Sequence, residues 1–194
     1  NEEDSEVKRV AEAASNPIRK LPYFTPSYKV ENGVTLLKTP EGDMPIEVFG
    51  AHNLNNLAGA KWICQNMGVD EADFYEAIAS FKGASKRLEK IAESTTKVAY
   101  KDFAHSPSKV AATTKAVKEQ YPNRTLIACL ELHTYSSLNA EFLKEYQGAL
   151  EHADVAVVFY SPDAVKIKQL EEVTYDQIAK AFNREDLIIY TNPK

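Results

Sequence analysis

The chain has 194 residues, of which 44% are hydrophobic and 26% are charged, and this fits a globular protein of one large or two small domains. Its net charge of −5 at pH 7 argues against general binding to nucleic acid or acidic membranes, because no basic surplus exists to neutralise phosphates. No apolar stretch approaches the length of a membrane span and no signal peptide opens the chain, so we expect a cytoplasmic protein in which Cys64 and Cys129 are buried, reduced thiols.

The first part of the chain is predicted to be rich in helix, with one hairpin. A turn signal at 40–43 separates two apolar runs, which predicts the hairpin, and Gly68 and Asp70 mark the end of one helix and the start of the next. Because the chain starts without Met, we expect a piece of a longer protein. The expected elements are a helix over 2–14, a proline-rich segment over 16–26, strands over 34–38 and 44–50, and helices over about 51–67 and 71–81.

The second part alternates strands with helices, which indicates an α/β domain with a mainly parallel sheet. Ligands gather at the carboxyl ends of the strands in such sheets. The composition changes at about 81–85, so we place a domain boundary there and expect domains over 1–82 and 83–194. The expected elements are strands over 98–103, 125–132, 155–160 and 187–190 and helices over 107–121, 140–152 and 174–182.

The stretch "GAHNLNN", residues 50–56, places a histidine and three amides where a helix begins. Asparagine is a good helix cap, so simple capping is one interpretation. The other is ligand binding, because Asn53 and Asn56 lie three residues apart on one helical face, where two carboxamides could read the edge of a purine.

Two further polar groups accompany the second domain. Arg87 lies in "SKRLE" and could be an ordinary solvated arginine of the linker. The strand over 98–103 ends at Asp102, and the chain then passes His105 and enters a helix at Ser106. A carboxylate, an imidazole and an open helix N-terminus make a plausible anion or ribose site, although simple helix capping explains the same residues.

The next strand ends in "CLELHTYSS", which offers His133, Thr134 and Tyr135 at a neighbouring position of the sheet. Two adjacent strand ends that each carry a histidine are stronger evidence for a site than either one alone. The four histidines have no metal-ligand spacing among themselves, no serine or cysteine triad pattern is present, and none of the seven glycines belongs to a phosphate-binding loop.

Three motifs in order, G-x-H-N-x-x-N, F-x-G-x-x-x-R-L-E and D-F-A-H-x-P, resemble those of the Mur ligases, and the resemblance covers nearly the whole chain. Mur ligases are bacterial, cytoplasmic, ATP-dependent enzymes that extend the peptide on UDP-N-acetylmuramic acid. They have a UDP-sugar domain, a central ATPase domain and a C-terminal Rossmann-like domain. The resemblance implies that residues 1–82 are the end of the central domain and residues 83–194 the C-terminal domain.

The resemblance also implies roles for the polar residues. Asn53 and Asn56 would hold the adenine, with His52 beside them, while Asp102 would reach the ribose hydroxyls of the nucleotide and Arg87 its phosphates. The strand-end residues His105, His133, Thr134 and Tyr135 would face the incoming amine substrate. The phosphate loop and the Mg²⁺ ligands would lie upstream, so we expect no catalytic residue here and no activity of this piece alone.

The partners implied are UDP-N-acetylmuramate and an amine substrate, with no nucleic acid and no membrane. The motifs most resemble two kinds of Mur ligase, one that adds L-alanine and one, the murein peptide ligase, that attaches L-alanyl-γ-D-glutamyl-meso-diaminopimelate. The segment 132–134 reads Leu-His-Thr where an arginine is usual, which favours the tripeptide over L-alanine. A non-catalytic nucleotide- or protein-binding module of Rossmann-like fold is the alternative from another class.

Overall fold

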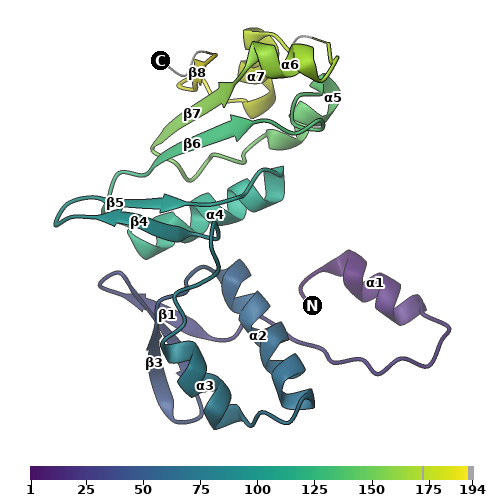
Figure 1. The fold of residues 1–194 in the computed structure, drawn as a ribbon, viewed down its shortest axis with the longest axis vertical. Helices are drawn as coiled ribbons and strands as arrows, with labels where there is room; N and C mark the ends of the chain where they lie inside the picture. Colours follow the sequence, from purple (N-terminus) through teal and green to yellow (C-terminus); the bar gives the residue numbers. More distant parts are fainter. Residues whose placement is uncertain (172, 192–194) are drawn as a thin grey trace. The chain divides into compact units, whose positions relative to one another are not determined.

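The computed structural model describes residues 1–171 and 173–191 and divides the chain into two units, Asn1–Gly83 and Ala84–Lys194. In the first unit, an antiparallel sheet of order β1-β2-β3 lies beside two helices (Figure 1). The predicted hairpin is confirmed, since Thr39 pairs with Gly42 at its turn. The elements are β1 (Tyr28–Glu31), β2 (Val34–Thr39), β3 (Gly42–Ile46), α2 (Ala51–Asn66) and α3 (Glu71–Ala79).

Strand β1 was not predicted, although the sequence carries its signal. Asn32 and Gly33 join β1 to β2 with φ angles of 53° and 77°. Positive φ at both central residues is what a tight two-residue hairpin turn requires, and Asn-Gly is the pair that tolerates it best. The sheet therefore has three strands instead of the expected two.

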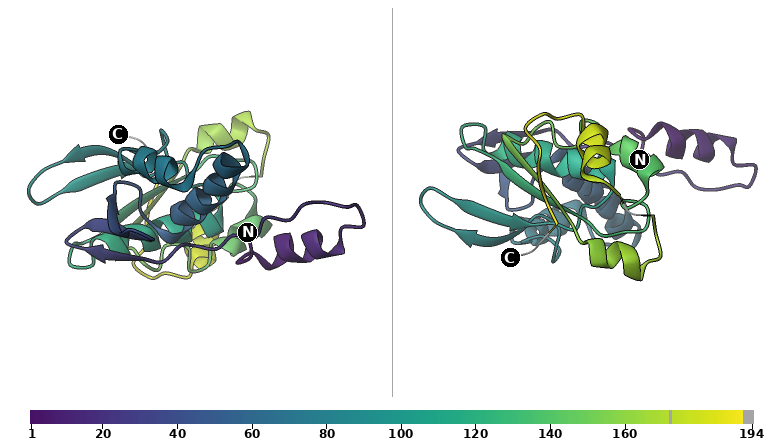
Figure 2. Two further views of the ribbon diagram at one scale, coloured as in Figure 1. Left: turned by 90° about the horizontal axis from the view of Figure 1, so that it is seen from below. Right: turned by 90° about the horizontal axis from the view of Figure 1, so that it is seen from above.

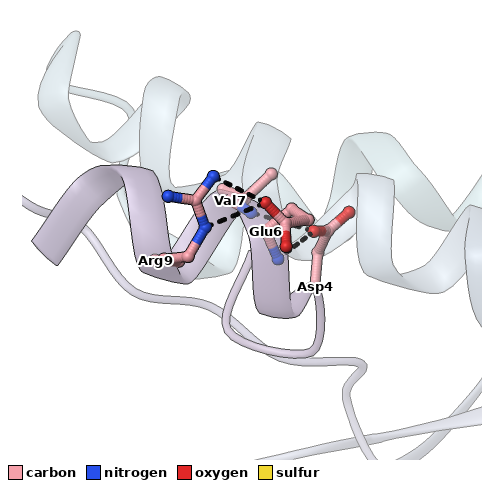
Figure 3. Close-up of polar contacts among 4 residues, drawn as sticks. All are labelled: Asp4, Glu6, Val7 and Arg9. Carbon is pink, nitrogen blue, oxygen red and sulfur yellow. Dashed lines mark hydrogen bonds and ion pairs between the residues drawn. The ribbon is translucent and has the colours of Figure 1, made fainter. Parts of the chain in front are cut away.

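Helix α1 (Ser5–Ala13) confirms the helix predicted over 2–14. Asp4 caps it by accepting hydrogen bonds from the backbone N–H groups of Glu6 and Val7, and the Arg9 guanidinium donates to the Glu6 carboxylate one turn earlier (Figure 3). No residue of α1 is buried, and both views in Figure 2 show the helix clear of α2 and α3. Its stability therefore rests on local capping and charge pairing.

A buried amide ties the start of the chain to α2. The Asn55 side chain is 7% exposed, and its Nδ2 lies 2.9 Å from Glu3 Oε2 and 3.2 Å from Thr25 Oγ1. The Glu3 carboxylate also accepts from the Thr25 backbone N–H at 3.0 Å and from its hydroxyl at 2.6 Å. Buried polar groups need such partners, so this amide of "GAHNLNN" serves the fold.

In the second unit, three strands form a parallel sheet of order β6-β7-β8, which confirms the α/β fold with a mainly parallel sheet. β6 and β7 are paired from Ile127 with Val155 to Leu132 with Tyr160. Their carboxyl ends therefore point to the same side, where α5 begins (Figure 1). The strands are β6 (Ile127–Leu132), β7 (Val155–Tyr160) and β8 (Ile188–Tyr190).

The strand expected over 98–103 is present as β5 (Val98–Lys101), but the prediction that it joins the parallel sheet was wrong. It pairs antiparallel with β4 (Glu89–Glu93), a strand that was not predicted. The Ser94 N–H donates to the Lys97 carbonyl at 2.7 Å and closes a short hairpin turn. Because β4 and β5 are close in sequence, they pair as a hairpin without a crossover connection. β4 therefore occupies one edge of β5.

The helices of the second unit follow the predictions with two exceptions. The single helix expected over 140–152 is broken into short α5 and η1, and Gly148, with a φ of 76°, then turns the chain out of helical geometry. The other is α6, which begins at Ser161-Pro162 and was not predicted. The helices are α4 (Pro107–Gln120), α5 (Ala140–Leu143), η1 (Lys144–Tyr146), α6 (Pro162–Ile167) and α7 (Tyr175–Phe182).

Each unit has its own hydrophobic core. The sheet and helices of the first unit meet around Leu37, Ile46, Leu54, Leu57 and Phe74. The larger core of the second unit lies between its sheet and helices and includes Val110, Leu132, Tyr146, Val158 and Ile178.

Two sequence expectations about burial can be compared with these cores. Cys129 is exposed and Cys64 half-buried, so the expectation of buried thiols was wrong. Alternation along β6 places Leu130 and Leu132 in the core and turns Cys129 to the opposite face. Within the described residues, none of the helices combines the length and apolar character needed to cross a bilayer.

Replacing Leu54 by alanine should lower the free energy of unfolding of the first unit by about 2–5 kcal/mol, because the side chain is fully buried and leaves a cavity. Trp62, the one tryptophan of the sequence, lies in α2, so its fluorescence during urea unfolding reports this unit. Ile63→Ala on the same helix is the control, since Ile63 is 63% exposed, and should change stability by less than about 0.5 kcal/mol. Equal effects of the two variants would contradict this core.

The stability of the first unit should fall in acid partly through Glu3. Hydrogen bonds from the Thr25 hydroxyl and N–H and from Asn55 hold the pKa of the Glu3 carboxyl below its usual 4.5. Its contribution is therefore complete above pH 4.5 and is lost as the pH falls through the lowered pKa. Glu3→Gln should flatten this acid dependence in urea unfolding measured by Trp62 fluorescence, whereas the control Glu12→Gln on α1 should leave it unchanged.

Candidate functional site

The strand end after β5 is held by the carboxylate of Asp102. Its Oδ2 accepts from the Leu88 N–H at 2.7 Å, and its Oδ1 accepts from the Ala104 N–H at 2.7 Å and from the Thr113 hydroxyl at 3.4 Å. These bonds fix the direction in which the chain leaves the strand. A carboxylate has about four acceptor positions, so three bonds leave room for one further donor.

His105 lies three residues after Asp102, and its backbone is hydrogen-bonded to a residue of the core. The hydroxyl of Tyr146, a fully buried side chain, donates to the His105 carbonyl oxygen. Burial raises the pKa of Tyr146 to about 12, so the phenol stays protonated and remains a donor at neutral pH. Ser106 then occupies the N-cap position of α4, although its side chain makes no capping hydrogen bond.

The strand end after β6 is a tight polar turn. The Thr134 hydroxyl lies 2.8 Å from Ser137 Oγ, and the Ser137 N–H donates back to that hydroxyl at 3.0 Å. Ser137 is 1% exposed, so this network is buried and holds the turn that carries His133. Thr134 is thus part of the support of the turn.

The two strand ends bring their histidines together. The ring centres of His105 and His133 are 6.0 Å apart, and the Phe103 ring lies 5.0 Å from that of His105 and 6.4 Å from that of His133. Both histidines are half-buried. The two strand ends therefore produce one imidazole pair, although β5 does not belong to the parallel sheet as the sequence pattern assumed.

The fourth predicted strand-end residue is placed differently. Tyr135 is 63% exposed, and the Lys168 ammonium lies 4.3 Å above its ring centre. This is a cation–π contact, and no sequence pattern singled out Lys168 for it.

A cavity of about 340 Å³ lies between β5 and β6, with Asp102, Ala104, Thr113 and Cys129 among its lining residues. Its volume falls within the range of small-molecule sites. It reaches the strand end at Asp102, so a ligand group of modest size could approach that carboxylate from inside the unit.

The amide stretch begins α2 in the first unit. Gly50 is the N-cap residue with a φ of 86°, and no side chain caps the helix. Asn53 donates from Nδ2 to the Phe49 carbonyl at 3.0 Å, which secures the first turn, while Asn56 is exposed on the same face. His52 is half-buried in the same turn. Of the three asparagines in this stretch, Asn56 is therefore the least involved in holding the fold together.

Arg87 is exposed, and its side chain makes no hydrogen bond or ion pair within residues 1–171 and 173–191. Neither does that part of the chain contain a group of three or more histidine, cysteine, aspartate or glutamate side chains suited to a metal ion. The structure thus leaves the guanidinium available for an anionic ligand.

The structure adds residues that sequence reasoning did not assign to the site. Phe103 stands inside one of the quoted motifs, and its contact with both imidazoles could have been suspected from its position. Tyr146 and Ser137 gave no signal, because a buried phenol or hydroxyl that supports a loop looks like any other core or turn residue in a sequence.

No protein-family model matches the chain. A curated relative, UDP-N-acetylmuramate–L-alanine ligase of Microcystis aeruginosa, is 33% identical over 160 residues, which are 79% of this chain and 32% of the relative. The chain spans about a fifth to a third of the length of the first curated relatives.

Solved structures share the fold. The UDP-N-acetylmuramate–alanine ligase MurC of Thermotoga maritima matches with a TM-score of 0.65 at 18% identity, over 86% of this chain and 36% of that one. A murein peptide ligase of Psychrobacter arcticus matches with a TM-score of 0.51 at 20% identity, over 82% and 33%. The chain is thus similar to Mur ligases in sequence, and it shares its fold with solved Mur ligases.

Proposed function

We propose that the chain is part of an ATP-dependent ligase that joins the amino group of L-alanine to the carboxylate of UDP-N-acetylmuramate. The observation that carries the proposal is the ordered set of three motifs. The first motif is the amide stretch, and the third contains His105 of the imidazole pair. Relatives from Lactococcus lactis and Microcystis aeruginosa bear the name of such a ligase. The chain covers a third of their length, so the proposal concerns the full-length enzyme.

In the first unit, the proposed contact with the nucleotide is the edge of the adenine. Asn56 is exposed and offers both a donor and an acceptor, which is the pattern that a purine edge requires. Asn53 lies one turn away, and its Oδ1 can still accept although its Nδ2 is bonded to Phe49. His52 completes this surface of α2.

In the second unit, Asp102 and Arg87 are the proposed partners of ribose and phosphate. Asp102 keeps acceptor capacity for one hydroxyl donor beside its bonds to Leu88, Ala104 and Thr113. Arg87 has no side-chain partner among the described residues, and such a guanidinium is suited to bidentate binding of phosphate oxygens. The residues present therefore fit a nucleotide.

The imidazole pair is the proposed contact for the incoming amine. In the reaction class, a carboxylate takes the γ-phosphoryl group of ATP and the resulting acyl phosphate is attacked by the amine, so positioning matters more than a protein nucleophile. His105 and His133 can accept hydrogen bonds from an ammonium group and hold it in one place, with Thr134 and Tyr135 at the same strand end. The phosphate loop and the Mg²⁺ ligands would belong to the remainder of the enzyme.

The tripeptide L-alanyl-γ-D-glutamyl-meso-diaminopimelate is the second candidate for the amine substrate. The observation in its favour is the sequence Leu132-His133-Thr134, which lacks the arginine that would bind the small carboxylate of L-alanine. A non-catalytic binding module remains the alternative outside the enzymes, and it predicts no turnover with either amine.

Asn56→Ala should weaken ATP binding to the full-length enzyme about threefold to tenfold, since one hydrogen bond contributes about 0.5–1.5 kcal/mol. Asn66→Ala, an exposed amide at the other end of α2, is the matched control and should bind ATP as the unaltered protein does. Asn53→Ala is a weaker test, because it also removes the bond to Phe49. Isothermal titration calorimetry measures the affinity, and an unchanged value for Asn56→Ala would remove this residue from the adenine contact.

The choice between the two amine substrates is decided by ADP release from the full-length enzyme in the presence of UDP-N-acetylmuramate. We expect turnover when L-alanine is supplied and little turnover with the tripeptide. The reverse pattern would establish the tripeptide as the substrate, and turnover with neither would favour the binding module. His133→Ala should raise the KM for the preferred amine, which distinguishes positioning of that substrate from a general loss of activity.

A further inference from the structure

The backbone on both sides of Arg87 is left-handed. Lys86 has a φ of 58° and Leu88 has a φ of 48°. A residue with a side chain rarely adopts this conformation, because its Cβ crowds the following carbonyl oxygen. Such residues persist only where the surrounding structure holds them, and they cluster at sites that bind ligands. The segment that carries Arg87 therefore needs support from its neighbours.

A carboxylate binds the backbone N–H of each left-handed residue. Glu89 Oε2 accepts from the Lys86 N–H at 2.7 Å, and this glutamate is half-buried. Asp102 Oδ2 accepts from the Leu88 N–H, also at 2.7 Å. The Phe103 N–H donates to the Lys86 carbonyl oxygen at 2.9 Å. The two residues that flank the arginine are thus held by their backbone groups.

Glu89 supports a turn in which glycine would be the usual residue. The Arg87 N–H donates to the Ala84 carbonyl at 3.1 Å, and this bond closes a β-turn with Lys86 at its third position. A positive φ at that position favours glycine. The Lys86 N–H and the Ser85 hydroxyl, which lies 3.1 Å from Glu89 Oε2, hold the pKa of the Glu89 carboxyl below its usual 4.5. The carboxylate is therefore ionised at neutral pH, and it stabilises a turn that lysine does not favour.

We infer that Glu89 is a positioning residue for Arg87, because the turn that it stabilises fixes where the arginine side chain leaves the backbone. A side chain that starts from a fixed backbone loses less conformational freedom when it binds a phosphate group, and this strengthens binding. The inference rests on the proposed phosphate contact of Arg87. Asp102 supports the same segment but is itself a proposed ligand contact, so Glu89 is the residue at which positioning can be tested separately.

The test is a double-mutant cycle in the full-length enzyme, with ATP affinity measured by isothermal titration calorimetry. Arg87→Ala should weaken ATP binding about tenfold, because hydrogen bonds between charged groups are stronger than neutral ones. Glu89→Ala should weaken it about threefold to tenfold when Arg87 is present, and by less than about twofold when Arg87 is already alanine. A merely structural loss would instead add to the effect of Arg87→Ala.

Three further variants separate positioning from folding and from charge. Glu89→Gln keeps an oxygen that accepts from the Lys86 N–H, so it should retain most of the affinity. Glycine adopts positive φ without strain, so Glu89→Ala should lower the affinity by less than about twofold in a Lys86→Gly protein, compared with Lys86→Gly alone. This pair also provides the comparison if Glu89→Ala alone does not fold, which circular dichroism checks. Glu93→Ala removes the carboxylate that pairs with Lys90 at the other end of β4, and it should bind ATP normally.

The outcomes distinguish this inference from the proposed function. An equal effect of Glu89→Ala with and without Arg87, or with lysine and with glycine at position 86, would overturn the positioning role and leave the phosphate contact in place. Unchanged affinity in Glu89→Ala, or a similar loss in Glu93→Ala, would also overturn it. Unchanged affinity in Arg87→Ala would remove the phosphate contact and the inference together, whereas the ligase activity is decided by ADP release.

Discussion

The hydrogen bond from the Tyr146 hydroxyl to the His105 carbonyl joins the strand end after β5 to the core of the second unit. It matters because β5 pairs with β4 and shares no backbone ladder with β6. The register of a parallel sheet therefore cannot bring the two strand ends together, and a buried side chain contributes to that placement. Val110 of α4, which follows the turn, is packed in the same core. The histidine pair depends on this contact between an irregular segment and a well-packed interior.

The polar residues that we propose as ligand contacts also make hydrogen bonds within the structure. Asp102 uses three acceptor positions for bonds to nearby residues, and Asn53 donates one Nδ2 proton to the Phe49 carbonyl. Asn55, in the middle of the same stretch, uses its Nδ2 group to hold the N-terminal segment. A side chain that is already oriented by the fold presents its remaining donors or acceptors in a fixed direction. Helix capping and ligand binding, which compete as explanations in the sequence, are compatible in the structure.

The sequence predicted most of the elements, because amphipathic periodicity and capping residues report local structure directly. It failed where tertiary geometry decides, as in the pairing of β5 with β4, and where a local signal was overlooked, as at Asn32-Gly33 and Ser161-Pro162. The closeness of His105 and His133 was anticipated from two strand ends in one sheet, and it holds although β5 lies in a separate sheet. The buried supports beneath them could not, because no pattern distinguishes Tyr146 from the other aromatic residues of the chain.

The position of β6 in its sheet has a consequence for local opening. Only β7 has a hydrogen-bonded neighbour on both sides in the described sheet, while β6 pairs on one side and faces the cavity toward β5 on the other. Edge strands open at a lower free energy than central ones, so amide protons of β6 should exchange with solvent ahead of those of β7. The strand that leads to His133 is thus at the less stable border of the sheet, where a bound ligand would add the most protection against exchange.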